Sequence, residues 1–251
     1  MKPEAGVWEI FSAIQGEGLM VGERHVFLRL AGCNLDCRFC DTPAREGARE
    51  TCAVERTPGR GDFESIPNPL EWTRATRAVV RLFRGQPPAR RVSVTGGEPL
   101  VSAEFVRRVV EALRAEGIGS VLETNGTLAD ALGPLEGLFD CISMDVKLPS
   151  SAGGAPLWNE HAEFLRVAAR GAVFVKLVIG PDTIANDVAR AARMIAEIDR
   201  RIPLVLQPVT PSRAVHETAP RSLLRALESV ANKELDDVRI IPQVHRVLGE
   251  P

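Results

Sequence analysis

The sequence predicts an α/β fold, an open and partial barrel of parallel strands in which each strand is followed by a helix. Short β-branched runs alternate with stretches of helical periodicity, in units of about 30 residues, as is typical of parallel βα packing. Six or so units are too few for a closed eight-stranded barrel once the long loops are subtracted. Periodicity alone leaves a doubly wound sheet as the alternative, and either architecture places the chemistry at the carboxyl ends of the strands.

The individual elements follow from short apolar runs and from helical spacing of large apolar residues. The predicted strands are residues 27–31, 91–94, 121–122, 141–146, 172–179, 204–206 and 238–241. The predicted helices are residues 103–116, 157–169, 184–198 and 220–230. Residues 43–69 are rich in Gly, Pro, Arg and Glu and show little periodicity, which predicts an irregular insertion. Without repeats or a low-complexity linker, the chain is expected to form one domain over residues 1–251.

Composition and charge exclude several classes of function. The chain has 251 residues and a net charge of −2, whereas non-specific nucleic-acid binding usually requires a strong basic excess. No apolar run approaches the roughly 18–20 residues that span a membrane, and the N-terminus lacks the pattern of a signal peptide. We therefore expect a cytoplasmic protein that binds neither nucleic acid nor membranes. Five cysteines, three of them within eight residues, favour a metal site over disulfides.

Cys33, Cys37 and Cys40 have C-x3-C-x2-C spacing, and a loop of this length can direct three thiolates at one iron–sulfur cluster. Clusters of the 4Fe–4S type normally take four cysteines. The remaining thiols are Cys52, in the insertion, and Cys141, in an apolar strand; if neither is a ligand, one iron stays open to an external ligand. The alternative is structural zinc, which favours paired C-x2-C arms and a fourth Cys or His that this sequence does not place suitably.

Residues 95–99, Thr-Gly-Gly-Glu-Pro, follow a predicted strand and precede a helix. Glycines at such a turn let the backbone approach a ligand closely. Together with the cysteine loop, this segment resembles the radical S-adenosylmethionine (SAM) superfamily. The resemblance implies a partial (β/α)6-type open barrel. It also implies that the open iron binds the amino and carboxylate groups of SAM, and that electron transfer cleaves SAM to a 5′-deoxyadenosyl radical.

Further segments narrow the resemblance, and they extend over nearly the whole chain. They are residues 9–18 (EIFSAIQGEG), 26–32, 41–42, 123–126, 147–151, 206–208 and the ending 243–251. Together they resemble the 7-carboxy-7-deazaguanine synthase family. The family converts 6-carboxy-5,6,7,8-tetrahydropterin to 7-carboxy-7-deazaguanine and ammonia, a step toward queuosine-type tRNA bases. The resemblance implies SAM, one 4Fe–4S cluster and Mg²⁺ as cofactors, and an electron donor such as flavodoxin or ferredoxin as partner; a homodimer is compatible with it.

The same resemblance implies roles for individual residues. The cluster ligands are Cys33, Cys37 and Cys40, and the Mg²⁺ ligand is Thr42. The expected SAM contacts are Phe39, Cys40, Asp41, Gly97, Glu98, Glu123, Ser143, Asp145, Lys147, Gln207 and Pro208. The expected substrate contacts are Ile14, Gln15, Gly16, Glu17, Arg29, Thr95 and Pro251. The segment 143–147 departs from the family's Ser-Pro-Lys form, which leaves open which of Ser143, Asp145 and Lys147 contacts SAM.

Two substrate contacts have a clear chemical basis. A guanidinium fork at Arg29 suits the pterin carboxylate, which it can bind through two parallel hydrogen bonds. Gln15 offers both a donor and an acceptor to the pterin edge. An activase of a glycyl-radical enzyme would share the cysteine loop but leave Arg29 and Gln15 without a role. A non-catalytic metal or iron–sulfur protein would not need so long a βα scaffold.

Overall fold

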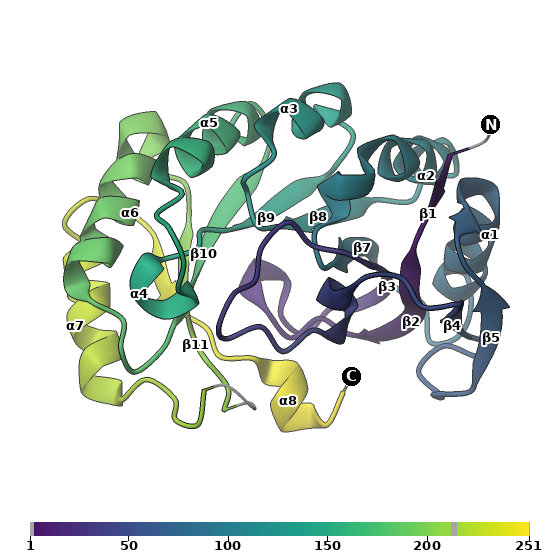
Figure 1. Ribbon diagram of the computed structural model, residues 1–251, viewed down its shortest axis with the longest axis horizontal. Coiled ribbons are helices and arrows are strands. Elements are labelled where there is room, and N and C mark those ends of the chain that lie inside the picture. The colour runs from purple at the N-terminus through teal and green to yellow at the C-terminus, as the bar shows by residue number, and fades with distance from the viewer. Residues whose placement is uncertain (1–2, 212–214, 251) are drawn as a thin grey trace.

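The computed structural model describes residues 3–211 and 215–250, which contain one large sheet flanked by helices (Figure 1). Ten strands form this sheet in the order β12-β11-β10-β9-β8-β7-β3-β2-β4-β5, and β1 and β6 form a separate two-stranded pair. The strands are β1 Glu4–Ala5, β2 Val7–Ile14, β3 Arg24–Leu30, β4 Thr51–Glu55, β5 Phe63–Pro67, β6 Leu70–Glu71, β7 Arg91–Gly96, β8 Ser120–Thr124, β9 Cys141–Asp145, β10 Val173–Ile179, β11 Leu204–Pro208 and β12 Val238–Ile240.

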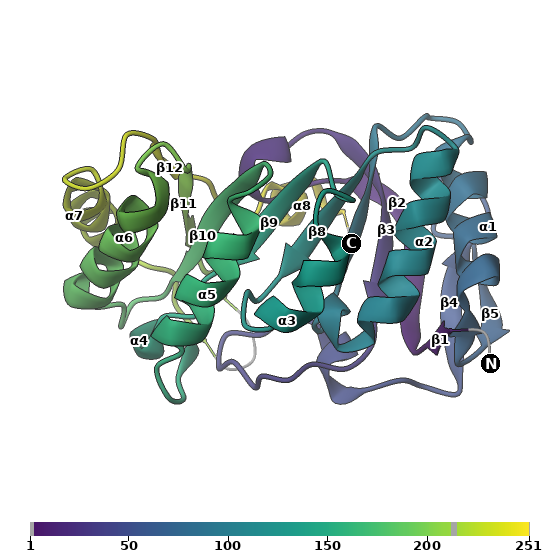
Figure 2. The same cartoon turned by 90° about the horizontal axis from the view of Figure 1, so that it is seen from above.

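All the helices except α8 connect strands, and most of them cover one face of the sheet (Figure 2). They are α1 Trp72–Phe83, α2 Ala103–Ala115, α3 Ala129–Leu132, α4 Pro149–Ala152, α5 Trp158–Ala168, α6 Ala185–Asp199, α7 Arg221–Ala231 and α8 Val244–Leu248. Short 3₁₀ turns lie at Gly18–Met20, Pro43–Glu46, Pro99–Ser102 and Gly133–Leu135. Among the described residues, no helix has both the length and the apolar character needed to cross a bilayer.

Six neighbouring parallel strands, from β3 through β7 to β11, each lead to a helix on the outside of the sheet, although β4, β5 and β6 come between β3 and its helix α1. The sheet ends at β12 on one side and at β5 on the other, so it does not close on itself. Figure 2 shows α2, α3, α5 and α6 side by side along the outer face. The predicted open (β/α)6-type barrel is confirmed.

The parallel strands are buried on both faces, which explains their continuous apolar sequences. β10 reads VFVKLVI, and Lys176 alone interrupts its apolar run. The helices bury a single face: α2 buries Phe105, Val109 and Leu113 at helical spacing and exposes its arginines, as amphipathic periodicity predicts. The strands and these helix faces share one large apolar core.

Residues 43–69 differ from the expected irregular insertion. They contain β4 and β5, which form an antiparallel pair, and β4 lies parallel to β2. The expectation is therefore wrong for these two strands, because their regularity depends on β2, a partner about 40 residues away in the sequence. Helix α1 was also not predicted, although Ala75, Val79 and Leu82 follow helical spacing and are buried.

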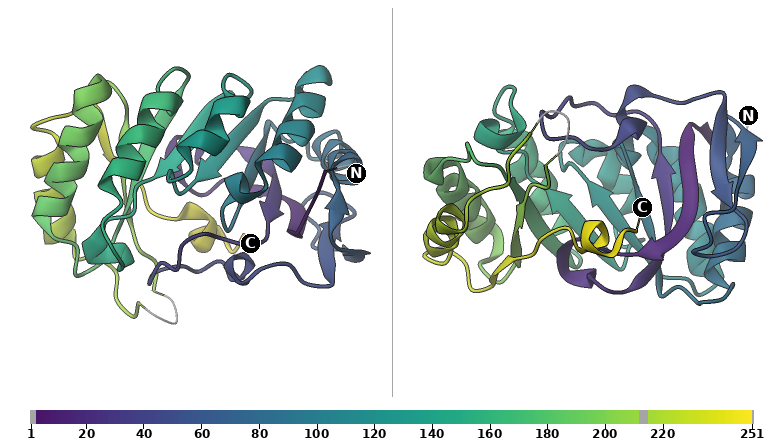
Figure 3. Two further views of the ribbon diagram at one scale, coloured as in Figure 1. Left: turned by 45° about the horizontal axis from the view of Figure 1, so that its top comes forward. Right: turned by 90° about the horizontal axis from the view of Figure 1, so that it is seen from below.

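The C-terminal helix α8 lies on the opposite side of the sheet from the other helices (Figure 3). Its first residue, Val244, donates its backbone N–H to the carbonyl oxygen of Gly16 at 2.8 Å. A side chain at Gly16 would overlap His245. The end of the chain and the turn after β2, which are more than 200 residues apart in sequence, are thus packed against each other.

Candidate active site

A cavity of about 350 Å³ lies on the inner side of the barrel, between the carboxyl ends of the strands, the cysteine loop and α8. The predicted site residues that line it are Ile14, Gln15, Gly16, Glu17, Arg29, Cys33, Cys37, Phe39, Cys40, Asp41, Thr42, Thr95, Gly97, Glu123, Ser143, Asp145, Lys147 and Gln207. Glu98 and Pro208 are not part of its wall. Pro251 lies outside the described residues.

The three cysteines of the loop all face this cavity. The backbone N–H of Leu35 donates to Cys33 Sγ at 3.4 Å, a contact that would stabilise a thiolate. Cys52 is buried in the apolar core and Cys141 begins β9, and neither lines the cavity. The protein therefore brings three thiols to the wall of one cavity, which fits a 4Fe–4S cluster with one iron left for an external ligand.

Burial raises the pKa of Cys37, and the nearby Lys147 ammonium opposes this effect. Burial likewise raises the pKa of Cys40. The protein alone therefore holds these thiols protonated, and ligation by iron would remove their protons. Within residues 3–211 and 215–250, no three His, Cys, Asp or Glu side chains converge as a single metal ion would require.

The glycine segment packs directly on the cysteine loop. A Cβ atom at Gly97 would overlap the carbonyl oxygen of Gly32 and contact Cys33. The next residue, Glu98, donates its backbone N–H to the same carbonyl at 2.8 Å. Gly96 has a φ of 139°, a value that side chains rarely adopt. Glycine is therefore required here both by backbone conformation and by the approach of the two loops.

Glu98 holds the glycine segment to the end of β8. Its carboxylate accepts hydrogen bonds from the Asn125 backbone N–H (2.7 Å), the Thr124 hydroxyl (2.9 Å) and the Leu100 backbone N–H (3.0 Å). The side chain is 1% exposed, and burial raises its pKa although these hydrogen bonds oppose the effect. These contacts are internal and give Glu98 a positioning role. Its contact with SAM stays a prediction.

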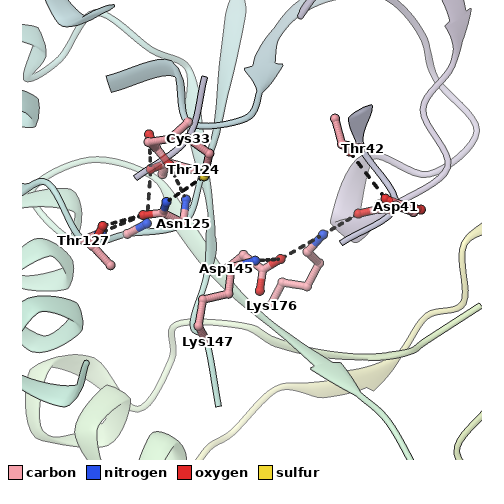
Figure 4. A network of polar contacts seen from close by, with 12 residues as sticks. Cys33, Asp41, Thr42, Thr124, Asn125, Thr127, Asp145, Lys147 and Lys176 are labelled. Atoms are coloured by element: carbon pink, nitrogen blue, oxygen red, sulfur yellow. Dashed lines mark hydrogen bonds and ion pairs between the residues drawn. The ribbon is translucent and has the colours of Figure 1, made fainter. Parts of the chain in front are cut away.

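Asn125 connects this same strand end to the cysteine loop (Figure 4). Its amide donates to Asn34 Oδ1 at 2.8 Å, and Asn34 donates to Thr127 Oγ1 at 2.9 Å. Thr127 closes the triangle by donating to Asn125 Oδ1 at 2.6 Å. We call residues 32–37, 95–98 and 124–127, which line this wall of the cavity or pack directly behind it, the cysteine side.

The opposite wall carries charges. Asp145, at the end of β9, lies 3.0 Å from the Lys147 ammonium and 3.4 Å from the Lys176 ammonium (Figure 4). Lys147 also lies over the Phe39 ring, 5.1 Å from its centroid, a favourable cation–π arrangement. We call the wall formed by Glu17, Asp145, Lys147, Lys176 and Gln243 the charged side.

Two polar atoms in the cavity wall are buried and have no hydrogen-bond partner among residues 3–211 and 215–250. They are Asp145 Oδ1 and Gln207 Oε1. Buried acceptors are nearly always hydrogen-bonded, so both oxygens are available to a ligand that brings donors into the cavity. This supports the sequence-based expectation that Asp145 and Gln207 contact a bound molecule.

Lys176 pairs with Glu17 as well as with Asp145. Burial by itself would raise the pKa of Glu17, but the Lys176 ammonium and a hydrogen bond from Gln243 lower it to about 2. Burial likewise opposes the charge of Lys176, but the two carboxylates raise its pKa. Both groups are therefore ionised throughout the neutral range.

Gln15 makes hydrogen bonds within the protein, and its contact with the substrate stays a prediction. Its amide nitrogen donates to Glu123 Oε1 at 2.7 Å and to Ser93 Oγ at 3.3 Å, and its oxygen accepts from the Glu17 backbone N–H at 3.0 Å. The donors and the acceptor are thus engaged within the protein. The side chain lines the cavity, and its hydrogen bonds fix Glu123 and the backbone of Glu17.

Arg29 reaches the cavity from β3. Its Nε–H donates to Glu9 Oε1 at 2.7 Å, and its guanidinium lies 5.4 Å from the centroid of the Phe11 ring. No residue in the described part of the chain pairs with its two Nη groups. The fork is therefore oriented from behind by Glu9 and Phe11, with its end available to an anionic group.

Near the mouth, the Thr42 hydroxyl lies 3.4 Å from Asp41 Oδ1. Oxygen donors of this kind suit Mg²⁺. Asp41 Oδ2 accepts a hydrogen bond from Arg246 at 2.7 Å, so α8 is held against the cysteine loop.

The wall residues that sequence reasoning missed include Lys176, Gln243, His245 and Arg246. The signal for Lys176 was its place as the lone charge in an apolar strand, where a charge needs a buried partner. The other three lie in the ending whose pattern was noted without assigning roles.

The Radical SAM superfamily pattern matches residues 28–202 of this chain. A 7-carboxy-7-deazaguanine synthase from Geobacter sulfurreducens is 42% identical over 250 residues, covering 99% of both chains. A protein of the same name from Methanothermobacter thermautotrophicus is 34% identical over 264 residues, covering 98% of this chain and 97% of its own.

Solved structures show the same fold at low sequence identity. QueE from Escherichia coli superposes with a TM-score of 0.60 at 19% identity, covering 96% of this chain and 94% of its own. SuiB from Streptococcus suis, solved with S-adenosylmethionine bound, gives a TM-score of 0.58 at 14% identity, over 84% of this chain and 48% of its own.

Proposed function

Since this chain belongs to the radical SAM superfamily and, within it, to the 7-carboxy-7-deazaguanine synthase family, we propose that its cavity converts 6-carboxy-5,6,7,8-tetrahydropterin to 7-carboxy-7-deazaguanine and ammonia. One observation carries this proposal beyond the family relationship. The same cavity is lined by three cluster-forming thiols and by Arg29, whose Nη groups are free of partners within the described part of the chain. A cofactor site and a site for an anionic substrate thus share one chamber.

A 4Fe–4S cluster and SAM, when bound, would supply a radical strong enough to remove hydrogen from carbon. Cys33, Cys37 and Cys40 would hold the cluster, and Asp145 Oδ1 and Gln207 Oε1 are buried acceptors available to the donors of SAM. Phe39 would lie beside the cofactor. The protein's own task is to orient both molecules and to keep water out of a largely enclosed site.

Arg29 would bind the pterin carboxylate through its Nη groups, because Glu9 already occupies the Nε–H. Two parallel charge-assisted hydrogen bonds would fix the substrate's orientation as well as its position. Glu123, held by Gln15 at 2.7 Å, adds an acceptor to the same cavity wall. Thr42 would bind Mg²⁺ through its hydroxyl, with substrate oxygens and water completing the shell.

We also propose a small electron-transfer protein, such as a flavodoxin or ferredoxin, as reductant, and a homodimer as the assembly. Residence in the cytoplasm suits the described cysteines, all of which are free thiols, because that compartment keeps thiols reduced. The alternatives, a glycyl-radical activase and a non-catalytic iron–sulfur protein, would not explain a relative of 42% identity over 99% of both chains that is named as the synthase.

The test is anaerobic incubation of the iron- and sulfide-reconstituted protein with SAM, Mg²⁺, dithionite and carboxytetrahydropterin. We expect mass spectrometry to detect the deazapurine. The Cys37→Ala protein should lose the cluster absorbance and produce none, whereas Cys141→Ala should retain both. SAM cleavage that proceeds without any deazapurine from the unmodified protein would refute the proposed substrate.

Arg29→Ala should still cleave SAM slowly but lose product formation by about a hundredfold or more, because it removes two charge-assisted hydrogen bonds that contribute about 1.5–3 kcal/mol each. Arg29→Lys should rescue only part of the rate, since an ammonium is a point charge and lacks the planar fork. Normal product formation by Arg29→Ala would remove this residue from the substrate site.

A further inference from the structure

A continuous series of polar contacts encircles the cavity, beginning and ending on the cysteine loop. From Phe39 it passes to the Lys147 ammonium (5.1 Å to the ring centroid), then to Asp145 Oδ2 (3.0 Å). Asp145 Oδ2 lies 3.4 Å from the Lys176 ammonium. This first half joins the loop beside the expected SAM position to the ends of β9 and β10.

The second half leads from Lys176 back to the loop by way of the chain ends. Lys176 pairs with Glu17, whose other oxygen accepts from Gln243 at 2.7 Å. Gln243 lies 3.5 Å from Asp41 Oδ2, which also accepts from Arg246 at 2.7 Å. The turn after β2 and the C-terminal segment are thereby linked to the residue that follows Cys40.

Lys176 is the one member of this series that joins its two halves. Its side chain is 12% exposed, and its two carboxylate partners come from the turn after β2 and from the end of β9. No other contact in the described part of the chain connects Glu17 to Asp145. Two buried carboxylates this close would repel each other without a cation between them.

A buried charge is expensive to desolvate, and apolar residues at the same position would often give an equal or greater stability. Its neighbours in β10 are all apolar. A lysine in this strand is therefore better explained by what it positions than by the stability it adds. It fixes Asp145, whose Oδ1 is buried and unpartnered in the cavity, and it fixes Glu17, which holds Gln243 of the C-terminal segment.

We propose that Lys176 is a positioning residue that couples the two ends of the site, so that closure of the C-terminal segment over the substrate and the alignment of Asp145 toward the cofactor depend on each other. The expected effects on catalysis rest on the proposed function. The link between Lys176 and the C-terminal segment does not. Loss of Lys176 would leave each end able to bind its own ligand and would separate the two events.

The test compares Lys176→Met with Lys233→Met, which removes an exposed lysine after α7. Hydrogen–deuterium exchange of the reconstituted protein, without pterin, should show the backbone of residues 243–248 exchanging about tenfold faster in Lys176→Met, since Glu17 loses its anchor. The KM for the pterin should rise at least about tenfold. The fraction of 5′-deoxyadenosine released without product should rise at least about fivefold. Lys233→Met should match the unmodified protein in each measurement.

A second variant distinguishes the loss of this contact from a general folding defect. The double variant Glu17→Gln/Lys176→Met leaves no unpaired carboxylate on the turn after β2, and the introduced amide oxygen can still accept from Gln243. Exchange of residues 243–248 should return to within about threefold of normal, while uncoupled SAM cleavage should persist because Asp145 remains unanchored. Lys176→Arg, which keeps the charge, should restore part of the coupling.

Two results would overturn the inference. One is normal exchange at residues 243–248 in a folded Lys176→Met protein. The other is a normal ratio of product to released 5′-deoxyadenosine in both Lys176→Met and Glu17→Gln/Lys176→Met. Failure of the proposed function is distinguishable, because the unmodified protein itself would then form no deazapurine. The exchange comparison would still decide the structural link.

Discussion

The cysteine side and the charged side face each other across one cavity, but different interactions hold them in place. The cysteine side depends on backbone packing and neutral hydrogen bonds, with Gly97 against Gly32 and Asn125 against Asn34. The charged side depends on ion pairs between side chains, with Lys176 between Glu17 and Asp145. The first wall is defined by steric fit and the second by charge balance.

This difference predicts which substitutions each wall can tolerate. Backbone contacts are set by atomic radii, so an added methyl group must displace a loop. Ion pairs between long, flexible side chains can adjust by rotation of those side chains. We therefore expect small substitutions to be severe on the cysteine side and graded on the charged side.

Gly97→Ala should give the largest effect in this comparison. Its Cβ would overlap the Gly32 carbonyl oxygen, and relieving such an overlap typically costs about 1–3 kcal/mol. Because the displaced loop carries the cluster ligands, SAM cleavage by the reconstituted protein should fall roughly ten- to hundredfold. The measurement is 5′-deoxyadenosine formation under excess dithionite.

Gly133→Ala is the matched control, because a Cβ there has nothing within 4 Å and the backbone is already helical. It should leave SAM cleavage unchanged. Equal rates for Gly97→Ala and Gly133→Ala would show that the cysteine side tolerates displacement, and the proposed contrast between the walls would disappear.

The free energy of unfolding should depend on pH through His161, which contacts both walls of the cavity. It accepts from the Lys147 backbone N–H at 3.1 Å and lies 3.0 Å from the Gly126 carbonyl oxygen. Burial lowers its pKa to about 4, whereas the unfolded chain titrates near 6.5. Between about pH 4 and pH 6.5 the unfolded state therefore binds more protons than the folded state. The free energy of unfolding is highest above about pH 6.5 and declines by roughly 3 kcal/mol as the pH falls toward 4.

Urea unfolding of the apo protein between pH 7 and pH 4 would measure this effect. His161→Gln keeps a donor and an acceptor but cannot be charged, so its stability should decline less steeply over the same interval. Parallel curves for the two proteins would mean that His161 does not carry the proton linkage.

Arg246→Ala should give the smallest effect. Its partner Asp41 and the arginine itself are both substantially exposed, and such pairs contribute about 0–1 kcal/mol. The KM for the pterin should rise no more than about fivefold, and the rise should vanish at high salt because screening already weakens the pair. A decrease in activity as large as that of Gly97→Ala would show that the contact between α8 and the cysteine loop tolerates substitution no better than the cysteine side.

Most of the fold could be predicted from the sequence because its elements have local signals. The predicted strand at 172–179 begins one residue before β10 and ends with it, and the predicted helix at 184–198 begins and ends one residue before α6. The signals fail where order depends on a distant partner: β4 and β5 are regular because β4 pairs with β2. The site divides in the same way. Cys33, Cys37, Cys40 and Gly97 were predicted from two short segments and line one cavity.

What the sequence determined by itself is therefore the cofactor chemistry, since thiols at fixed spacing and glycines at a tight turn act through local backbone geometry. Only the tertiary structure decided how the cavity is completed. In the folded protein, the Gln15 amide hydrogen-bonds at both ends within the protein, and Glu98 accepts a hydrogen bond from the Asn125 backbone. Lys176 lies between the carboxylates of Glu17 and Asp145. The physical reason is that charge pairing and hydrogen-bond satisfaction depend on distances in space, which separation along the chain does not encode.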